Sequence, residues 1–540
     1  MIILSILLLL VAMSLPSIKN QITPVLFSRI VLLSLTYSAI LAINMVYIQS
    51  IGSGVGLFAG LFQITIISQL TDIFIFLIAS SILIISQFYT YKSNYDTISL
   101  STNKTNTVAE PQILLKNKDE ISEYSLIILF SVAGGSLLIS SADLVSMYLS
   151  IELQSFAVYI LATIYKNSLS STSAGLKYFL LGGLSSCLIL LGSGIIYTYT
   201  GLSNLESIYS LVSVSDSINI NQGFTLGLTL ILVGFLFKVS AAPFHNWAPD
   251  VYDNVPTIVT TWLSIMPKIS IFIFLLEIQS LPWIDYNILN VEFYNKNLLL
   301  ISSLLSLIIG SVVGLAQVRI KRLLTYSTIS HVGFLLLALS INTEQSVEAF
   351  LFYIVQYTIT NLNLFLILLS FGYILYIKPK NNYLYSNNLS KDTNNYKLND
   401  KNDIENITDL KGQFNNNPIL GLTFAISLFS MAGIPPLIGF FGKQQVLYSA
   451  TYNGYYFLSL VAIIVSVISA SYYLKIIKEI HFSNINVNIL NINNKNEDLL
   501  IQNSPSYLIS VLTLINLLFI LNPSLILNGI HLIALSLFYT

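Results

Sequence analysis

Two lysines and one glutamate lie deep inside long apolar stretches of this sequence, where charged side chains are costly. Lys238 and Lys268 each stand fifteen residues from Asp253, near the turn between two such stretches, and Glu152 lies at a matching depth in a third. Residues equally far from the turn of an antiparallel helix pair lie at equal depth, so both lysines are expected near the middle of a bilayer. A carboxylate favours the ammonium form of a lysine, whereas burial opposes it. The pattern predicts a site that loads and releases a proton, with a purely structural buried ion pair as the alternative.

Three more titratable residues are candidates for the same pathway. Lys443 follows the Pro435-Pro436 pair by seven residues, and His331 lies in the middle of its apolar stretch. Lys177 lies near one end of its stretch. A satisfied core histidine is the alternative for His331, and a side chain that reaches the membrane interface is the alternative for Lys177. Charged groups nearer the segment ends are expected in solvated or capping roles: Arg29, Asp72, His245 and Glu277.

The composition requires an apolar environment. Of 540 residues only 24 are Lys or Arg and 25 are Asp or Glu, 54% are hydrophobic, and the mean hydropathy is +0.76, whereas soluble proteins carry charge at about a quarter of their positions. A single cysteine, Cys187, excludes a disulfide framework, a thiolate zinc site and a cysteine-ligated iron–sulfur cluster. Four widely spaced histidines leave little for haem, so no cofactor is expected in this chain. The net charge of −1 argues against nucleic acid as a partner.

Fourteen stretches match the template of about 20 apolar residues that a spanning helix needs. The first begins at Met1 with neither a basic flank nor a small-residue cleavage site, so it is expected to be a retained helix rather than a signal peptide. The sequence therefore predicts an all-α polytopic membrane protein. The stretches lie near residues 1–15, 25–47, 70–90, 124–141, 143–165, 174–200, 222–250, 255–279, 297–317, 322–341, 347–377, 418–449, 453–480 and 506–535.

Helix breakers interrupt the seventh and the twelfth stretch, at Ala241-Ala242-Pro243 and at Gly433-Ile434-Pro435-Pro436. Such breaks are tolerated at membrane depth where protein or a watery cavity covers them. Stretches four to eight and nine to thirteen can be superimposed, each with a broken fourth helix and a buried lysine. Because five is odd, the two repeats are inverted, which is typical of ion-coupled transporters. The expected domains are 1–120 with three helices and a loop, 121–280 and 295–480 with the two repeats, and 481–540 with a loop and the last helix.

Basic residues are distributed unevenly among the predicted loops. The odd-numbered loops carry 18 Lys and Arg residues and the even-numbered loops carry one. Positive residues stay on the side from which helices are inserted, here called the cis side. Fourteen spans then place both termini on the opposite, trans side. The loop 378–417 is rich in Asn, Lys and Asp, so it is expected to be solvated, poorly ordered and without chemistry.

Five longer motifs run through the chain, at Tyr148–Ser155, Ala174–Gly182, Lys238–Asp253, Lys321–Phe334 and Gly433–Lys443. Together they resemble the antiporter-like membrane subunits of respiratory complex I, over roughly residues 120–535. The composition resembles that of a mitochondrially encoded fungal copy, because Asn, Ile, Tyr, Phe and Lys are abundant and there are only three arginines. The Asn-rich loop 378–417 departs from the compact pattern of the family.

The resemblance implies a multi-pass subunit of the mitochondrial inner membrane, with the cis side in the matrix and both termini in the intermembrane space. It implies that FMN, the iron–sulfur clusters and ubiquinone belong to other subunits, and that the partners are membrane-arm subunits, neighbouring antiporter-like ones among them, and lipids. The alternatives are a cation/proton antiporter and a scaffold that fills the membrane arm without conducting. The resemblance carries a proton path onto six residues, with Glu152 and Lys238 as a coupled pair, Lys177 as a modulator, Lys268 and His331 as central relays, and Lys443 as the exit lysine.

Overall fold

The computed structural model describes residues 1–15, 24–48, 54–101, 123–166, 168–214, 218–280, 289–377, 403–482 and 503–539. Within these ranges ten helices are long and apolar enough to cross a membrane, and a pair of helices bent by 85° would make an eleventh span. The prediction of a polytopic, mostly helical membrane protein is confirmed, although the chain also forms a small two-stranded sheet. Three of the fourteen expected spans contain shorter apolar helices: Ile2–Ser14, Glu123–Ile139 and Pro418–Ala432.

The chain divides into two compact units, which we describe separately. Unit 1 comprises Met1–Val239, Trp262–Leu298 and Leu532–Thr540, and unit 2 comprises Ser240–Thr261 and Leu299–His531. Helix α11, Thr257–Ser280, begins in unit 2 and continues into unit 1.

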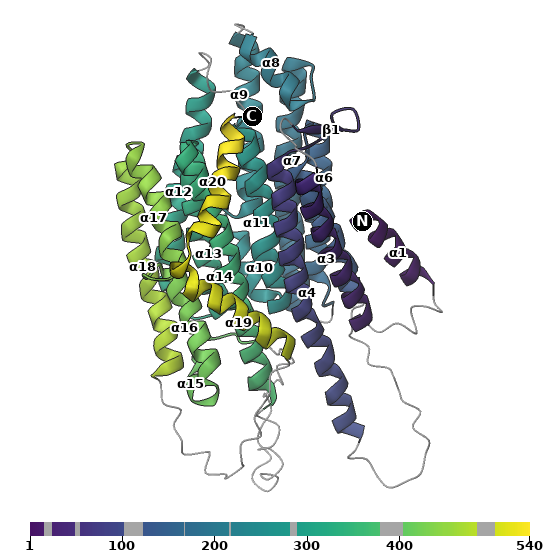
Figure 1. The fold of residues 1–540 in the computed structure, drawn as a ribbon, viewed down its shortest axis with the longest axis vertical. Helices are drawn as coiled ribbons and strands as arrows, with labels where there is room; N and C mark the ends of the chain where they lie inside the picture. Colours follow the sequence, from purple (N-terminus) through teal and green to yellow (C-terminus); the bar gives the residue numbers. More distant parts are fainter. Residues whose placement is uncertain are drawn as a thin grey trace. The chain divides into compact units, whose positions relative to one another are not determined.

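Unit 1 is built mainly from pairs of neighbouring helices. Helix α3 packs on α4, α5 on α6, and α7 on α9, and Figure 1 shows α3 and α4 side by side. A two-stranded antiparallel sheet, β1 with β2, lies between α3 and α4 in the sequence. The elements of unit 1 are α1 (Ile2–Ser14), α3 (Pro24–Ile48), β1 (Val55–Leu57), β2 (Phe62–Ile64), α4 (Ile66–Ser101), α5 (Glu123–Ile139), α6 (Leu144–Thr163), α7 (Leu169–Thr200), α8 (Leu205–Val214), α9 (Ile218–Val239), most of α11, and the start of α12 (Leu289–Leu315).

Local sequence signals fix the helix that carries Glu152. Asp143 is the N-cap of α6, because its carboxylate accepts a hydrogen bond from the Val145 amide at 2.8 Å, and Ser203 Oγ donates to its second oxygen at 2.7 Å. Helix α5 approaches α6 closely at Gly134, where an added Cβ would lie 2.5 Å from the backbone nitrogen of Gln154. The depth and rotation of α6 are therefore set by its cap and by a small residue on its neighbour.

Unit 2 contains the second broken helix. Helix α14 packs on α13, α16 and α17, and α16 packs on α18. Figure 1 shows α16, α17 and α18 in green. The elements of unit 2 are α10 (Trp247–Asn254), the start of α11, most of α12, α13 (Ile320–Ile341), α14 (Glu344–Ile377), the 3-10 helix η2 (Ile407–Leu410), α15 (Gln413–Asn416), α16 (Pro418–Ala432), α17 (Ile438–Tyr452), α18 (Tyr456–His481), α19 (Asn503–Leu518), the 3-10 helix η4 (Phe519–Leu521) and the first half of α20 (Ser524–Tyr539), whose second half belongs to unit 1.

Both predicted helix breaks are present. Helix α9 ends at Val239, Ser240 has a φ of +66°, and α10 begins only at Trp247. Helix α16 ends at Ala432, Gly433 adopts the left-handed conformation with a φ of +87°, and α17 begins at Ile438. Each break ends one helix next to a buried lysine, so backbone carbonyls without a helical donor are available there.

Two expectations about the second half of the chain are wrong. The last stretch, 506–535, is not one spanning helix, because α19 and α20 meet at the bend of 85°. The loop 378–417 is not solvated throughout. Residues 378–402 lie outside the described residues, but the following segment 403–417 forms η2 and α15 and buries Ile404, Ile407 and Leu410. These apolar residues recur every three positions, and burying them stabilises the segment.

Candidate functional site

Lys238 and Glu152 form a buried ion pair in unit 1. Lys238 lies in the last turn of α9, and its Nζ donates a hydrogen bond to Glu152 Oε1 on α6 over 3.2 Å. The two side chains are only 7% and 12% exposed. The other carboxylate oxygen of Glu152 accepts a hydrogen bond from Ser155 Oγ at 3.5 Å. The structure therefore brings together the two residues that were predicted to lie at the same depth. The C-terminal end of α9 adds partial negative charge near the Lys238 ammonium.

A buried amide ties the Glu152 helix to the Lys268 helix. Gln154 Nε2 donates to Ser270 Oγ at 2.8 Å, and the side-chain oxygen Oε1 of Gln154 lies 3.0 Å from the same hydroxyl. Gly135 on α5 makes room for this amide, since an added Cβ would lie 3.2 Å from Gln154 Nε2. Glu152 lies two residues before Gln154, and Lys268 lies two residues before Ser270. The contact therefore holds both charged residues at fixed depths within unit 1.

The other candidates in unit 1 differ in burial. Lys268 is 3% exposed and directly follows Pro267 inside α11. Lys177 lies on the exposed side of α7, so the alternative of a side chain that reaches the interface stays open for it. Asp72 on α4 is not in the solvated role that was expected, because its Oδ1 is buried and has no hydrogen-bond partner among the described residues. Its place at a segment end therefore did not imply that both carboxylate oxygens contact water.

His331 is held between two tyrosines inside unit 2. Its Nδ1 lies 2.7 Å from the Tyr353 hydroxyl on α14, and its Nε2 lies 3.4 Å from the Tyr473 hydroxyl on α18. The imidazole is 2% exposed, and both tyrosines are fully buried. A neutral imidazole donates through one nitrogen and accepts through the other. This geometry suits a satisfied core histidine, and it equally suits a group that passes a proton from one hydroxyl to the next.

Lys443 is buried at the break between α16 and α17. Its Nζ donates to the carbonyl oxygen of Ala432, the last residue of α16, over 2.8 Å. The aliphatic part of the side chain lies over Gly433, where an added Cβ would come within 2.9 Å of Lys443 Cδ. The ammonium also lies 5.6 Å from the centre of the Phe334 ring. Backbone carbonyl charge at a helix C-terminus and an aromatic face therefore stabilise this ammonium.

Aromatic rings connect the surroundings of Lys443 with those of His331. Phe334 and Tyr353 are stacked, with ring centres 5.7 Å apart and an interplanar angle of 23°. Phe334 thus contacts Lys443 on one side and the tyrosine that hydrogen-bonds His331 on the other. Two predicted relay residues of unit 2 therefore belong to one continuous buried cluster.

A second buried lysine–carboxylate pair lies at the start of α13. Lys321 Nζ donates to Asp403 Oδ2 at 2.7 Å and to the Val255 carbonyl at 2.8 Å. Asp403 also accepts from the backbone amide and the hydroxyl of Thr257, at 3.0 and 2.9 Å, and so caps α11. Burial by itself raises the pKa of the Asp403 carboxyl, but the Lys321 ammonium and the hydrogen bonds from Lys321 and Thr257 outweigh it and hold the pKa below its usual value.

Arginines extend this charged cluster toward solvent. Arg319 Nη1 lies 2.7 Å from Asp253 Oδ2, and Arg322 Nε lies 3.1 Å from the same oxygen. Arg322 also pairs with Asp250 at 3.0 Å. Both arginine side chains are more than a third exposed, so these pairs contribute little to stability individually. They fix α10 against the first turn of α13.

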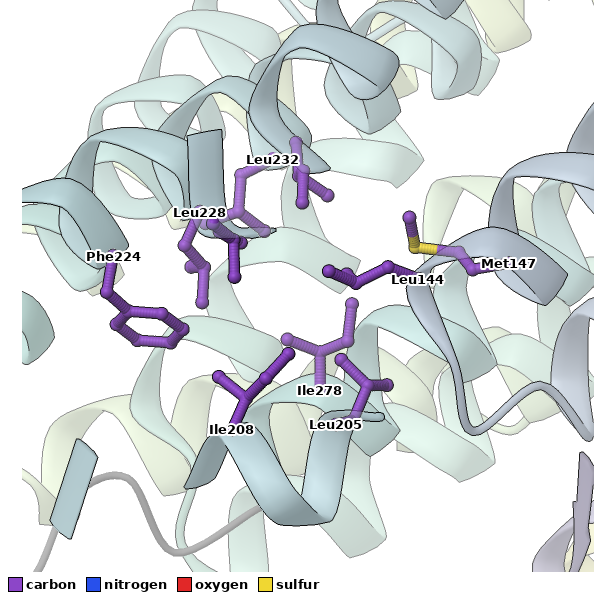
Figure 2. A pocket seen from close by; sticks show the side chains of 10 residues that line it. Leu144, Met147, Leu205, Ile208, Phe224, Leu228, Leu232 and Ile278 are labelled. Atoms are coloured by element: carbon purple, nitrogen blue, oxygen red, sulfur yellow. The ribbon is translucent and has the colours of Figure 1, made fainter. Parts of the chain in front are cut away.

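An apolar cavity of about 20 Å³ lies inside unit 1. Figure 2 shows aliphatic side chains and the Met147 thioether around it. A cavity of this size has room for about one water molecule, but its lining offers no polar partner for one. Its lining residues are Leu144, Met147, Ile196, Leu205, Ile208, Phe224, Leu228, Ile231, Leu232 and Ile278.

The sequence reasoning missed the tyrosines and the amides. Tyr353 and Tyr473 are two of 32 tyrosines, and nothing in their spacing separates them from tyrosines that face lipid. Gln154 carried a weak signal, because a glutamine inside an apolar stretch requires a hydrogen-bond partner. Across the described ranges, no group of three or more His, Cys, Asp or Glu side chains is arranged to hold a metal ion.

Discontinuous helices at membrane depth are typical of ion-coupled transporters. Residues 141–469 match the family described as NADH:quinone oxidoreductase/Mrp antiporter, TM, and the chain belongs to this family. It is 52% identical, over the full length of both chains, to the NADH-ubiquinone oxidoreductase chain 2 of Rhizopus oryzae. The chain is therefore an antiporter-like membrane subunit of the complex I type.

Two solved structures share the fold over nearly the whole chain. A chain of respiratory complex I from Thermus thermophilus matches 98% of this chain and 99% of its own length, with a TM-score of 0.69 and 24% identity. A chain of the Mrp complex from Dietzia sp. matches 99% of this chain and 96% of its own length, with a TM-score of 0.74 and 17% identity. Both relatives are chains of multi-subunit membrane assemblies.

Proposed function

We propose that this chain provides one proton path through the membrane arm of the mitochondrial NADH:ubiquinone oxidoreductase, with its termini in the intermembrane space. The chain holds no redox centre itself in this proposal. FMN, the iron–sulfur clusters and ubiquinone are bound by other subunits of the complex, and energy reaches the chain through neighbouring membrane-arm subunits. The name of the Rhizopus oryzae relative supports the assignment to a mitochondrial enzyme.

The observation that carries the proposal is the buried pair of Lys238 and Glu152. With the carboxylate 3.2 Å away, the ammonium form of Lys238 is stabilised against the cost of burial. When the pair separates or Glu152 is screened by another cation, that stabilisation falls and Lys238 releases its proton. Small movements at the end of α9 therefore load or unload one proton, and the broken helix lets the lysine move without disrupting a continuous hydrogen-bond ladder.

The remaining candidates receive roles that follow from their surroundings. Lys268, buried in α11, is a second carrier in unit 1, and Lys177, exposed on α7, modulates the charge of the pair from outside the core. His331, between two hydroxyls, relays protons by exchanging its ring tautomers. Lys443 is the exit lysine, because a carbonyl holds its ammonium less firmly than a carboxylate would.

Substitution of Lys238 in the assembled complex tests this function. Lys238→Ala is expected to lower NADH:quinone activity and proton pumping together, because a coupled enzyme stops when one carrier is removed. Lys238→Arg is expected to impair pumping as well, since guanidinium keeps its charge but does not release its proton. Assembly is checked by native gel. Full coupled pumping by an assembled Lys238→Ala complex would instead assign the chain the role of a scaffold.

A further inference from the structure

Gln356 is a buried amide beside the exit lysine with unused hydrogen-bonding capacity. It lies on α14, three residues beyond Tyr353, and is 0% exposed. Neither its Oε1 nor its Nε2 has a hydrogen-bond partner among the described residues. An amide that is buried without hydrogen-bond partners destabilises the fold, so its retention in a helix core requires a reason.

The amide faces the break that holds Lys443. An added Cβ at Gly442, the neighbour of Lys443, would lie 2.9 Å from Gln356 Oε1, and one at Gly439 would lie 3.2 Å from Gln356 Nε2. The two glycines lie on the face of α17 that meets α14, and their lack of side chains leaves the amide against the helix backbone. Gly439 lies four residues before Lys443 and so shares a face of α17 with the lysine, and the Gln356 amide packs against that face.

A hydroxyl completes the polar cluster. Ser430 on α16 is 0% exposed, and its Oγ has no hydrogen-bond partner within the described part of the chain. A Cβ added at Gly439 would clash with the Ser430 backbone carbonyl, so the backbone of Ser430 and the amide of Gln356 approach the same residue from two helices. Two residues further along α16, Ala432 accepts the hydrogen bond of Lys443. An ammonium has three N–H donors, and one of them reaches Ala432.

On its other side the cluster adjoins the histidine relay. Tyr353 lies one turn before Gln356 on α14, and its hydroxyl hydrogen-bonds His331 at 2.7 Å. An added Cβ at Gly442 would also lie 3.3 Å from the Tyr353 ring. The face of α14 that meets α17 thus carries, in order, the tyrosine of the relay and the amide beside Lys443.

We propose that Gln356 positions a water molecule that carries protons between the Tyr353–His331 relay and Lys443, with Ser430 as its second ligand. Buried water is stable where two to four polar partners surround it, and the amide, the hydroxyl and the ammonium supply that number. In the transfer, one O–H bond of the water breaks as the proton passes to the lysine amine, and the water regains a proton from the relay. Gln356 is a positioning residue, because it neither gains nor loses the proton. This inference rests on the proposed proton path.

The same helix offers a control residue. Asn363 lies seven residues beyond Gln356 on α14, is 0% exposed, and has neither side-chain atom hydrogen-bonded within the described part of the chain. Loss of its amide removes a buried polar group of the same chemistry at a place away from Lys443. The pair of substitutions therefore separates a role in proton transfer from a general effect on the packing of α14.

The test compares Gln356→Met, Gln356→Glu and Asn363→Leu in the assembled complex, with membrane-potential formation measured across a range of pH. Gln356→Met keeps the length of the side chain but removes its hydrogen bonds, and it is expected to slow pumping at least about tenfold at every pH, as loss of a positioned proton-transfer group does. Gln356→Glu keeps an acceptor and places a carboxylate beside Lys443. It is expected to retain the water and to shift the pH optimum upward by about one unit or more, because the new charge holds the proton on the lysine. Asn363→Leu is expected to pump normally.

Lys443→Ala, measured in the same assay, separates failure of the positioned water from failure of the whole proton path. An inactive Lys443→Ala complex beside a normally pumping Gln356→Met complex overturns the positioned water and leaves the proton path intact. An active Lys443→Ala complex overturns the path itself. Equal losses in Gln356→Met and Asn363→Leu, with no pH shift in Gln356→Glu, assign Gln356 to packing and overturn the inference.

Discussion

The two broken helices stabilise their buried lysines in different ways. In unit 1 the ammonium of Lys238 is paired with the carboxylate of Glu152, at the end of the helix that carries the lysine. In unit 2 the ammonium of Lys443 follows the break and reaches back to a backbone carbonyl and an aromatic ring. A full negative charge holds a proton more firmly than a carbonyl dipole does. In the proposed proton path, this difference makes Lys238 the site that captures a proton and Lys443 the site that releases it.

The unit 2 site is most sensitive to the geometry of its break, so the largest effect is expected from Pro435→Ala combined with Pro436→Ala. In a continuous helix the amide of residue 436 would donate to the Ala432 carbonyl, the acceptor that Lys443 now uses. Lys443 would lose its partner and turn about the helix axis. We expect an assembled complex that loses most of its pumping, measured as membrane potential.

Pro418→Ala is the matched control for this double substitution. Pro418 lies in the first turn of α16, where proline neither breaks the helix nor competes for a carbonyl. We expect near-normal pumping from it. If the double alanine also pumped normally, the break would not be what positions Lys443.

The Lys321–Asp403 pair sharpens the comparison, because it is a buried lysine–carboxylate pair outside the proposed path. Asp403→Asn leaves Lys321 buried without its counter-ion, which is expected to cost about 3–5 kcal/mol of stability. The folded carboxyl has a lowered pKa, so its contribution is present above the unfolded value near 3.8 and is lost as the pH falls through the folded value. The thermal unfolding temperatures of the variant and the wild-type complex should differ at neutral pH and converge only as the pH falls through the lowered pKa of folded Asp403.

The Asp403→Asn substitution should lower stability without changing the pH dependence of proton pumping. Because Asp403 is not a carrier in this account, the pH profile of pumping by the assembled Asp403→Asn complex should match that of the wild type. A shifted profile would mean that the charged cluster at α13 takes part in proton transfer.

The smallest effect is expected from removing residues 383–396, in the Asn-rich segment before Asp403. Loop length changes closure entropy only slowly, and the excised residues include none of the buried anchors Ile404, Ile407 and Leu410. Assembly and pumping should stay near normal. Extending the deletion through residue 414 should instead destabilise the complex, because it removes those anchors and Asp403. Equal tolerance of both deletions would contradict the packing described for residues 403–417.

The depth of charged residues could be predicted from the sequence, because it depends only on chain position along a helix. The equal depth of Lys238 and Glu152 follows from such arithmetic, and the breaks at Pro243 and Pro435 follow from residue type, because proline removes a backbone donor. The packing of residues 403–417 could not be predicted in the same way, because a composition averaged over forty residues hides three apolar positions. The bend between α19 and α20 did carry a signal. Asn522-Pro523 interrupts the last stretch, and proline removes a backbone donor there.

Partners across the core escape sequence reasoning for a different reason. His331 contacts tyrosines that lie 22 and 142 residues away in the chain. Gln356 meets Gly439 and Gly442 only because α14 packs on α17. Helical periodicity shows which residues share a face, but it does not show which helix covers that face. The candidate carriers were therefore predictable one by one, whereas the groups that connect them required the fold.

The pH dependence of membrane-potential formation in the assembled Glu152→Gln complex tests the claim that Glu152 holds the proton on Lys238. The amide keeps the shape of the side chain and part of its hydrogen bonding, but it removes the charge that holds the proton on Lys238. We predict that the alkaline limb of the profile moves to lower pH, and that Glu152→Ala moves it likewise and lowers the rate further. An unmoved profile in both assembled variants would contradict the claim, because the pair would then serve packing rather than proton capture.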